Sequence, residues 1–273
     1  MRPEVPPLIE KARLLRRDVF SMIHQCGDGH PGAALSITDL LTALYFHVMR
    51  VDPQNPDWPE RDRFILSKGH GCPSYYAALA RRGFFPVDWL PTLRKLGSPL
   101  QGHPVMKKTP GVDMTTGSLG HGIPIGAGMA AAGRLAKLDY YVYVITGDGE
   151  LNEGILWEAV QSAAHMKLGR LIAFVDNNGW QSGGVIKDVS GLTNLAAPFA
   201  AFGWHTQEID GHDFSQILDA IEKAKAEFER PSVIIAHTVK GKGIPFTEND
   251  NAWHKRVPNK EELAAALKYL GGS

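Results

Sequence analysis

Hydrophobic residues follow two different spacings along this chain, and segments with the two spacings alternate. Near the amino terminus, Leu8, Leu15 and Ile23 belong to an apolar series at helical spacing, and Arg13, Arg16 and Arg17 lie on its polar side, which predicts an amphipathic helix. Further helical patterns cover residues 36–47, 73–81, 123–138, 153–166, 214–228 and 259–273. Continuous runs rich in β-branched and aromatic residues predict strands at residues 63–67, 141–147, 171–176, 204–210 and 233–238. This alternation predicts an α/β fold with a doubly wound, mostly parallel sheet flanked by helices.

Composition narrows the classes of protein to which the chain can belong. Its 273 residues fit one domain spanning residues 1–273. Lys and Arg total 29 and balance 29 Asp and Glu, so we expect neither nucleic acid nor a membrane surface as a partner. No apolar run approaches the length of a membrane span, and residues 1–7 lack a signal-peptide core, so we expect a cytoplasmic protein. Cys26 and Cys72 form no disulfide framework or zinc-ligand spacing, and we expect both to be buried as small hydrophobes.

Two predicted strands end in polar residues that suit a metal-bound phosphate. Asp148 lies in a Gly-Asp-Gly turn after the strand at 141–147, and Asn178 follows the next strand, thirty positions later (178 minus 148). The carboxyl ends of parallel strands are where open α/β sheets bind ligands, and a helix N-terminus nearby favours phosphate. A carboxylate and an amide oxygen suit Mg²⁺. A Gly-Asp-Gly sequence alone is usually just a turn, but the paired strands favour a binding site.

Four histidines lie in turns rich in glycine or proline. They are His30, His70, His103 and His254. Each alone is more often a structural or exposed residue than a functional one. Four in this setting favour a site where imidazoles bind phosphate or sugar hydroxyls and transfer protons, with glycines letting a ligand approach the backbone.

The order of these motifs resembles the amino-terminal, cofactor-diphosphate-binding part of transketolase, over nearly the whole chain. The matching segments are Gly29-His30-Pro31-Gly32-Ala33, Ser67-Lys68-Gly69-His70, Gly102-His103-Pro104, Gly117-Ser118-Leu119-Gly120-His121-Gly122, Gly147-Asp148-Gly149 with Asn178, and Lys240-Gly241-Lys242-Gly243 before His254. The resemblance implies a thiamine diphosphate (ThDP)-dependent transfer of a two-carbon ketol unit between sugar phosphates. The cofactor would supply the reactive carbon, and the protein would position it.

The same resemblance assigns the cofactor and metal contacts. Asp148, Asn178 and the main-chain carbonyl of Trp180 would hold Mg²⁺, or Ca²⁺ or Mn²⁺ as a substitute. The residue pair Gly179-Trp180 departs from the residues usual in full-length relatives, and the Trp180 side chain could narrow the pocket. The contacts to the diphosphate and the aminopyrimidine would come from His70, the Gly149 amide, His254, Gly117 and Leu119.

The remaining implied roles are catalytic. His30 and His103 would face the reacting sugar and assist proton transfer, and His254 would share that work. Glu153 resembles the glutamate that couples active sites across a dimer. The glutamate that protonates the aminopyrimidine belongs to a second domain in full-length transketolases and has no counterpart here. We therefore expect the partner to be a carboxyl-terminal transketolase subunit, in an α2β2 assembly.

Several alternatives stay open. The chain could serve another ThDP-dependent enzyme, such as one similar to deoxyxylulose-phosphate synthase or a ketol transferase for an unusual sugar, or it could be a non-catalytic cofactor-binding subunit. Residues 120–126 miss the dinucleotide fingerprint by one residue and contain Pro124, which disfavours NAD. The loop at 240–243 is either a solvated turn or part of a lid on the phosphate side.

Overall fold

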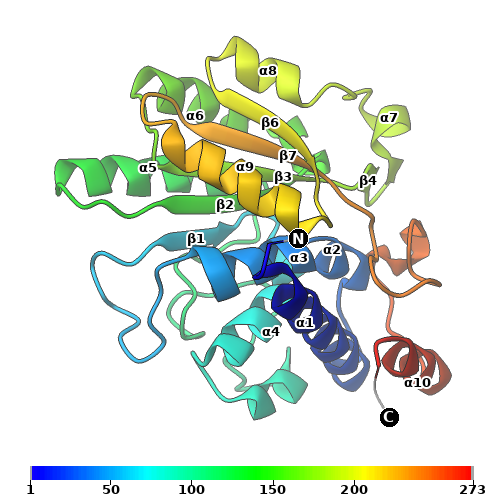
Figure 1. Cartoon of the computed structure of the whole chain (residues 1–273). Helices are drawn as coiled ribbons and strands as arrows, with labels where there is room; N and C mark the ends of the chain where they lie inside the picture. The colour runs from blue at the N-terminus through cyan, green and yellow to red at the C-terminus, as the bar shows by residue number, and fades with distance from the viewer. Residues whose placement is uncertain (1, 272–273) are drawn as a thin grey trace.

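The computed structural model describes residues 2–271 and contains a five-stranded parallel sheet with the order β1-β2-β3-β7-β6. The strands run across the middle of the molecule in Figure 1. Their bounds are β1 Arg63–Leu66, β2 Val142–Gly147, β3 Leu171–Asn177, β7 Ser232–His237 and β6 His205–Asp210. The predicted doubly wound α/β fold is therefore confirmed, and each predicted strand differs from its observed bounds by no more than two residues at either end.

The sheet divides two hydrophobic cores, because successive side chains of a strand point to opposite faces. Ile145 and Phe174 belong to the first core, whereas Val144 and Val175 belong to the second. All four side chains are fully buried. Strands covered on both faces become continuously apolar, which is why β2 and β3 lack an alternating polar pattern.

Helices cover both faces of the sheet. The first core is closed by α1 (Val5–Cys26), α2 (Pro31–Ser36), α3 (Thr38–Ala43), α4 (Cys72–Arg82) and α9 (Phe214–Ala226). The second core is closed by α5 (Gly122–Leu135), α6 (Gly154–His165) and α8 (Ala196–Ala201). In α5, a Cβ on Gly126 would lie 2.8 Å from the Val144 side chain. Glycine at this position therefore lets α5 pack directly on β2, as its glycine- and alanine-rich sequence predicts.

Short elements account for most differences from the prediction. The sequence analysis did not identify α2 or α8, each of six residues, or α7 (Ile186–Val189) and the hairpin of β4 (Trp180–Gln181) with β5 (Gly184–Val185). The remaining single turns are η1 (Leu44–Val48), η2 (Gly69–Gly71), η3 (Val87–Thr92), η4 (Gly149–Asn152) and η5 (Asn251–His254). Segments this short do not complete enough turns to show a hydrophobic period.

The two ends of the described chain are helical. Helix α1 ends at Gly27, whose φ of 75° closes the helix in the left-handed conformation that glycine tolerates. Helix α10 (Lys260–Tyr269) begins at a capping box formed by Asn259 and Glu262. Positions 272–273 of the predicted carboxyl-terminal helix lie outside the described residues. Across residues 2–271, the helices are all too short or too polar to cross a membrane.

The two cysteines occupy different environments. Cys72 is buried, as predicted, at the start of α4, whereas Cys26 is only half-buried at the end of α1. The expectation that both are buried is therefore wrong for Cys26, because it lies in the last turn of a helix that ends at the surface.

Candidate active site

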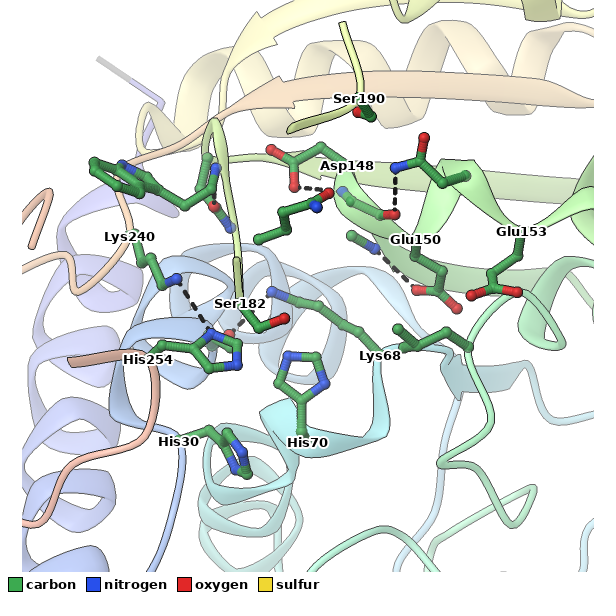
Figure 2. Close-up of a pocket in the computed structure, with 18 of the residues that line it drawn as sticks. His30, Lys68, His70, Asp148, Glu150, Glu153, Ser182, Ser190, Lys240 and His254 are labelled. Atoms are coloured by element: carbon green, nitrogen blue, oxygen red, sulfur yellow. Dashed lines mark hydrogen bonds between the residues drawn. The ribbon is translucent and has the colours of Figure 1, made fainter. Parts of the chain in front are cut away.

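A cavity of about 540 Å³ lies where β1, β2 and β3 end, and Figure 2 shows the side chains around it. Its walls come from the segments after these three strands, from the start of α2 and from η5. All eleven residues predicted for the site line this cavity. They are His30, His70, His103, Gly117, Leu119, Asp148, Gly149, Glu153, Asn178, Trp180 and His254. The structure therefore brings the whole predicted set together, from positions up to 224 residues apart (254 minus 30).

Asp148 is a buried carboxylate at the inner end of the cavity. One side-chain oxygen accepts the Gly149 amide at 2.8 Å, and the other accepts the Gly179 amide at 2.6 Å. Only 2% of the residue is exposed. Burial raises the pKa of Asp148 to about 7, and the nearby Asp176 contributes to that rise. The surroundings therefore disfavour the ionised form of Asp148 unless a cation binds beside it.

Asp176 lies behind Asp148 and organises the residues around it. Its side chain accepts hydrogen bonds from Ser36 at 2.7 Å, from Thr238 at 2.5 Å and from the Asn178 amide at 2.7 Å, and it forms an ion pair with Lys68. Burial alone would raise the pKa of Asp176, but Lys68 and these hydrogen bonds hold it below its usual value. Asp176 is therefore an ionised, fully buried anchor.

The two predicted side-chain ligands of the metal contact the same turn of backbone. Asp148 accepts the Gly179 amide, and the side-chain oxygen of Asn178 accepts the Trp180 amide at 3.1 Å. Gly179 has a φ of 77°, a conformation that few other residues adopt. A buried carboxylate with a raised pKa, beside an amide oxygen and main-chain carbonyls, is a donor set that fits Mg²⁺. Within residues 2–271, no group of three or more His, Cys, Asp or Glu side chains could hold a metal, so oxygen ligands of mixed type are the candidates.

Three of the four predicted histidines form a cluster on the opposite wall, as Figure 2 shows. The ring centroids of His30, His70 and His254 lie 5.3 to 5.7 Å apart. Burial and neighbouring positive charge lower the pKa of His30 and of His254 to about 4, and lower that of His70 well below its usual value. The pKa of the exposed His103 is lowered by the same two causes. These imidazoles are therefore neutral near pH 7 and able to accept a proton or a hydrogen bond.

One atom of this cluster lacks a partner. The Nδ1 of His30 is buried and has no hydrogen-bond partner among the described residues. A buried polar atom left unsatisfied is costly, which indicates that a ligand or water completes this wall.

Lys240 lies in the cavity wall, and its burial decides between the two interpretations of the loop at 240–243, a solvated turn or part of a lid. Only 1% of it is exposed, and its ammonium group donates to Asn251 at 2.6 Å and lies 3.2 Å from Nδ1 of His254. Burial lowers the pKa of Lys240 to about 8, and Lys68 contributes to that shift. The solvated-turn interpretation of 240–243 is therefore wrong for Lys240, because its long side chain turns inward over the ring of Trp180.

A buried ionic group holds the Lys240 loop in place. Arg16 donates to the carbonyl of Lys242 at 3.0 Å and pairs with Asp39. His212 lies 2.7 Å from Asp39 through Nδ1, and its Nε2 accepts the amide of Val239 at 2.9 Å. The backbone on both sides of Lys240 is thus fixed by side chains from α1, α3 and the turn before α9. The predicted placement of Arg16 on the polar side of its helix is wrong, because its side chain is buried against Asp39.

Glu150 is a further buried carboxylate that the sequence did not identify. It accepts hydrogen bonds from Ser67 at 2.5 Å, from the Gly120 amide at 2.7 Å and from the Gly147 amide at 3.1 Å. These bonds tie the turn before Asp148 to the loop that carries Gly117 and Leu119. Glu153, by contrast, is exposed at the start of α6.

The two ends of the cavity carry different groups. The inner end holds the buried carboxylate of Asp148 and the ion pair of Lys68 with Asp176, whereas Lys240 and the imidazoles lie opposite. This arrangement suits an anion that carries a divalent cation on one side, such as a metal-bound diphosphate.

Comparisons of sequence and of structure relate this chain to known proteins. The family model for the transketolase, thiamine diphosphate binding domain, matches residues 7–273. The 6-deoxy-6-sulfo-D-fructose transketolase subunit SqwG of Clostridium sp. is 45% identical over 263 residues, covering 96% of each chain. An apulose-4-phosphate transketolase subunit of Actinobacillus succinogenes is 43% identical, covering 96% of this chain and 95% of that relative. The crystal structure of transketolase from Campylobacter jejuni superposes with a TM-score of 0.93 at 32% identity, covering 98% of this chain and 43% of that one. The chain thus spans less than half of that full-length enzyme.

Proposed function

This chain belongs to the transketolase family, as the domain that binds thiamine diphosphate, and on that premise we propose that it is the cofactor-binding subunit of a two-chain transketolase. The family and the transferase class expected from the sequence are confirmed by these similarities. The proposed reaction transfers a two-carbon ketol unit from a ketose to an aldose, both with an anionic end. One observation carries the proposal: all eleven residues that the family resemblance assigns line one cavity.

The inner end of the cavity supplies the proposed metal and diphosphate contacts. Asp148, Asn178 and the main-chain carbonyl of Trp180 would hold Mg²⁺ against the diphosphate, because Asp148 directly follows β2, and Asn178 and Trp180 follow the neighbouring β3. The anion would meet His70, His254 and the buried Lys240 on the opposite wall.

The Gly149 amide requires a rearrangement for its proposed role. In this structure it donates to Asp148 at 2.8 Å. A cation bound at Asp148 would compete for that oxygen and free the amide for the diphosphate. Gly117 and Leu119 lie on the cavity side of the loop that Glu150 fixes, where they would line the aminopyrimidine pocket.

When bound, thiamine diphosphate supplies the nucleophilic carbon that takes up the two-carbon unit. The chain's own contribution is to orient the sugar and to move protons. His30 and His103 would hold the hydroxyl groups of the sugar, and His254 would share in proton transfer. Their lowered pKa values keep these imidazoles neutral near pH 7, so they can accept a proton from a hydroxyl group and return it.

The proposed partner is a chain that carries the pyrimidine-binding domain. Two relatives that align with this chain over 95% or more of their own length are named as transketolase subunits. The exposed Glu153 begins α6 near the exposed Ile155, in a position where a second protein chain could contact it. An α2β2 assembly in the cytoplasm, with sugar phosphates as substrates, completes the proposal.

The test is ketol transfer from xylulose 5-phosphate to ribose 5-phosphate with ThDP and Mg²⁺. It is measured for this chain alone and for this chain co-purified with a candidate carboxyl-terminal transketolase subunit. We expect turnover only in the pair and weak cofactor binding by the single chain. Full turnover by the single chain would refute the two-chain proposal. A cofactor-loaded pair that is inactive with these sugars, but active in another ThDP-dependent reaction, would refute the substrate assignment.

A further inference from the structure

A charged group adjoins the histidine wall, and none of its members lines the cavity proposed for the cofactor and the metal. We call it the outer rim and define it as Asp28, Arg94 and Lys255. Asp28 lies two residues before His30, and Lys255 directly follows His254. Arg94 donates to the carbonyl of Gly102 at 3.4 Å, next to His103. Each member is therefore coupled through the backbone to one imidazole of the cavity.

The outer rim carries one more positive than negative charge. The Arg94 guanidinium donates to Asp28 at 2.8 Å, and the Lys255 ammonium lies 3.9 Å from the other oxygen of Asp28. A single carboxylate thus faces two cations. Their side chains are 26% and 61% exposed respectively, so an anion arriving from solvent can reach both.

The backbone holds Arg94 in an unusual conformation. Its φ is 59°, in the left-handed region that a side chain such as arginine rarely adopts. Its amide donates to the carbonyl of Leu100 at 2.8 Å. A Cβ on Gly102 would lie 2.5 Å from the Arg94 guanidinium carbon, so only glycine lets the guanidinium approach the backbone there.

Two further observations place the outer rim beside the sugar-binding wall. Positive charge on Arg94 contributes to the lowered pKa of both His30 and His103. The Nδ1 of His30, which has no hydrogen-bond partner among the described residues, leaves a buried polar atom on this wall that a ligand or a water would satisfy. A sugar held by His30 and His103 would therefore extend from the inner cavity toward these cations.

We propose that the outer rim binds the terminal anionic group of the sugar substrate, a tetrahedral oxyanion such as a phosphate or a sulfonate. The inference rests on the proposed function and assigns to this chain part of the selection for charged sugars. Arg94 offers several donors in a fixed plane and Lys255 a mobile point charge. Asp28 positions both cations and competes with the ligand for them.

The experiment uses the assembled, ThDP-loaded complex and compares acceptors that differ only in the terminal group, ribose 5-phosphate and ribose. Lys255→Gln should lower kcat/KM for ribose 5-phosphate about 5-fold, and Arg94→Lys about 10-fold, with little change for ribose. Asp28→Asn should act in the opposite direction and raise kcat/KM for ribose 5-phosphate about 3-fold, because it removes the competing carboxylate. The exposed Lys223→Gln on α9 makes the same charge change as Lys255→Gln and should have no effect.

Two ketose substrates that differ in their terminal group show whether the outer rim recognises phosphate or sulfonate. Equal losses with fructose 6-phosphate and 6-deoxy-6-sulfofructose would show that the rim recognises charge alone, and a loss confined to one would assign the rim to that group. Calorimetric titration of ribose 5-phosphate and ribose into the loaded complex gives the same comparison without turnover. If the rim variants lose kcat/KM equally for ribose 5-phosphate and ribose, or lose it for neither, the inference is overturned. A complex that transfers no ketol unit to any acceptor, but still binds ribose 5-phosphate more tightly than ribose, would instead refute the proposed function and leave the inference standing.

Discussion

The inner and outer ends of the cavity are built on opposite principles. At the inner end, Lys68, Asp148 and Asp176 are each at most 3% exposed, and every one of them has hydrogen-bonded partners. At the outer end, His103 is exposed and the buried Nδ1 of His30 has no partner among the described residues. Apart from the Gly149 amide, the inner end is held by these bonds before any ligand arrives, as suits a resident cofactor. The outer end leaves polar groups free for molecules that come and go.

Removing the inner carboxylate should have the largest effect. Asp148→Ala in the assembled complex should abolish Mg²⁺-dependent ThDP retention, a loss of affinity of about 1,000-fold, because it deletes the only charged member of the proposed metal-ligand set. Calorimetric titration of ThDP with and without Mg²⁺ measures it. The exposed Asp57→Ala is the matched control. Unchanged Mg²⁺-dependent binding in Asp148→Ala would exclude this carboxylate as the ligand.

Breaking the buried ion pair of Lys68 with Asp176 should have the next largest effect. Lys68→Met leaves Asp176 buried without its cation and should lower the free energy of unfolding by about 3 kcal/mol. Denaturant titration of the cofactor-free chain measures it.

A double variant shows whether the lost stability comes from the unpaired charge of Asp176. Lys68→Met with Asp176→Asn removes both charges and should regain a large part of the lost stability. If the double variant is as unstable as the sum of the two single variants, the ion pair contributes no coupling energy.

The ease of prediction differs between the residues of the turn motifs and the buried charged residues that hold them. The eleven predicted residues belong to short motifs in turns, which a sequence displays directly. Asp176 and Lys68 lie 108 positions apart, and nothing local in either segment indicates that the fold joins them. Lysine is usually exposed, so the burial of Lys68 and Lys240 contradicts the ordinary expectation for that residue type. The fold was predictable because each buried strand is a continuous apolar run and each amphipathic helix carries its own periodic pattern.

At the outer wall, His103→Ala should reduce turnover about 30-fold and change the dissociation constant of ThDP less than about 3-fold. The reason is that His103 lies at the exposed side of the cavity, away from the inner carboxylates. Steady-state kinetics and ThDP titration of the assembled pair separate the two quantities. His47→Ala, an exposed histidine outside the cavity, provides the control. A loss of ThDP affinity equal to the loss of turnover would move His103 to the cofactor contacts.

The smallest expected effect is a pH dependence with opposite signs at the two ends. His30 and His254 have pKa values of about 4 in the folded chain, against 6.5 ordinarily. Between these values the unfolded chain binds more protons, so their contribution to stability is present above about pH 6.5 and is lost as the pH falls to 4. Asp148, with its pKa raised from 3.8 to about 7, acts in reverse and destabilises the fold as the pH rises through that window.

The contribution of the two imidazoles can be separated from that of Asp148 by comparing the wild type with a variant that lacks both imidazoles. Both rings are partly exposed, so solvent screening limits each to about 1 kcal/mol. The free energy of unfolding of the cofactor-free chain is measured by denaturant titration at pH 7 and pH 5, for the wild type and for His30→Asn with His254→Asn. Asp148 is present in both proteins and cancels in the comparison. We expect the wild type to lose about 2 kcal/mol more than the variant on going to pH 5. Equal losses would mean that the two imidazoles titrate normally, and the outer wall would then be as open to solvent as the rim beyond it.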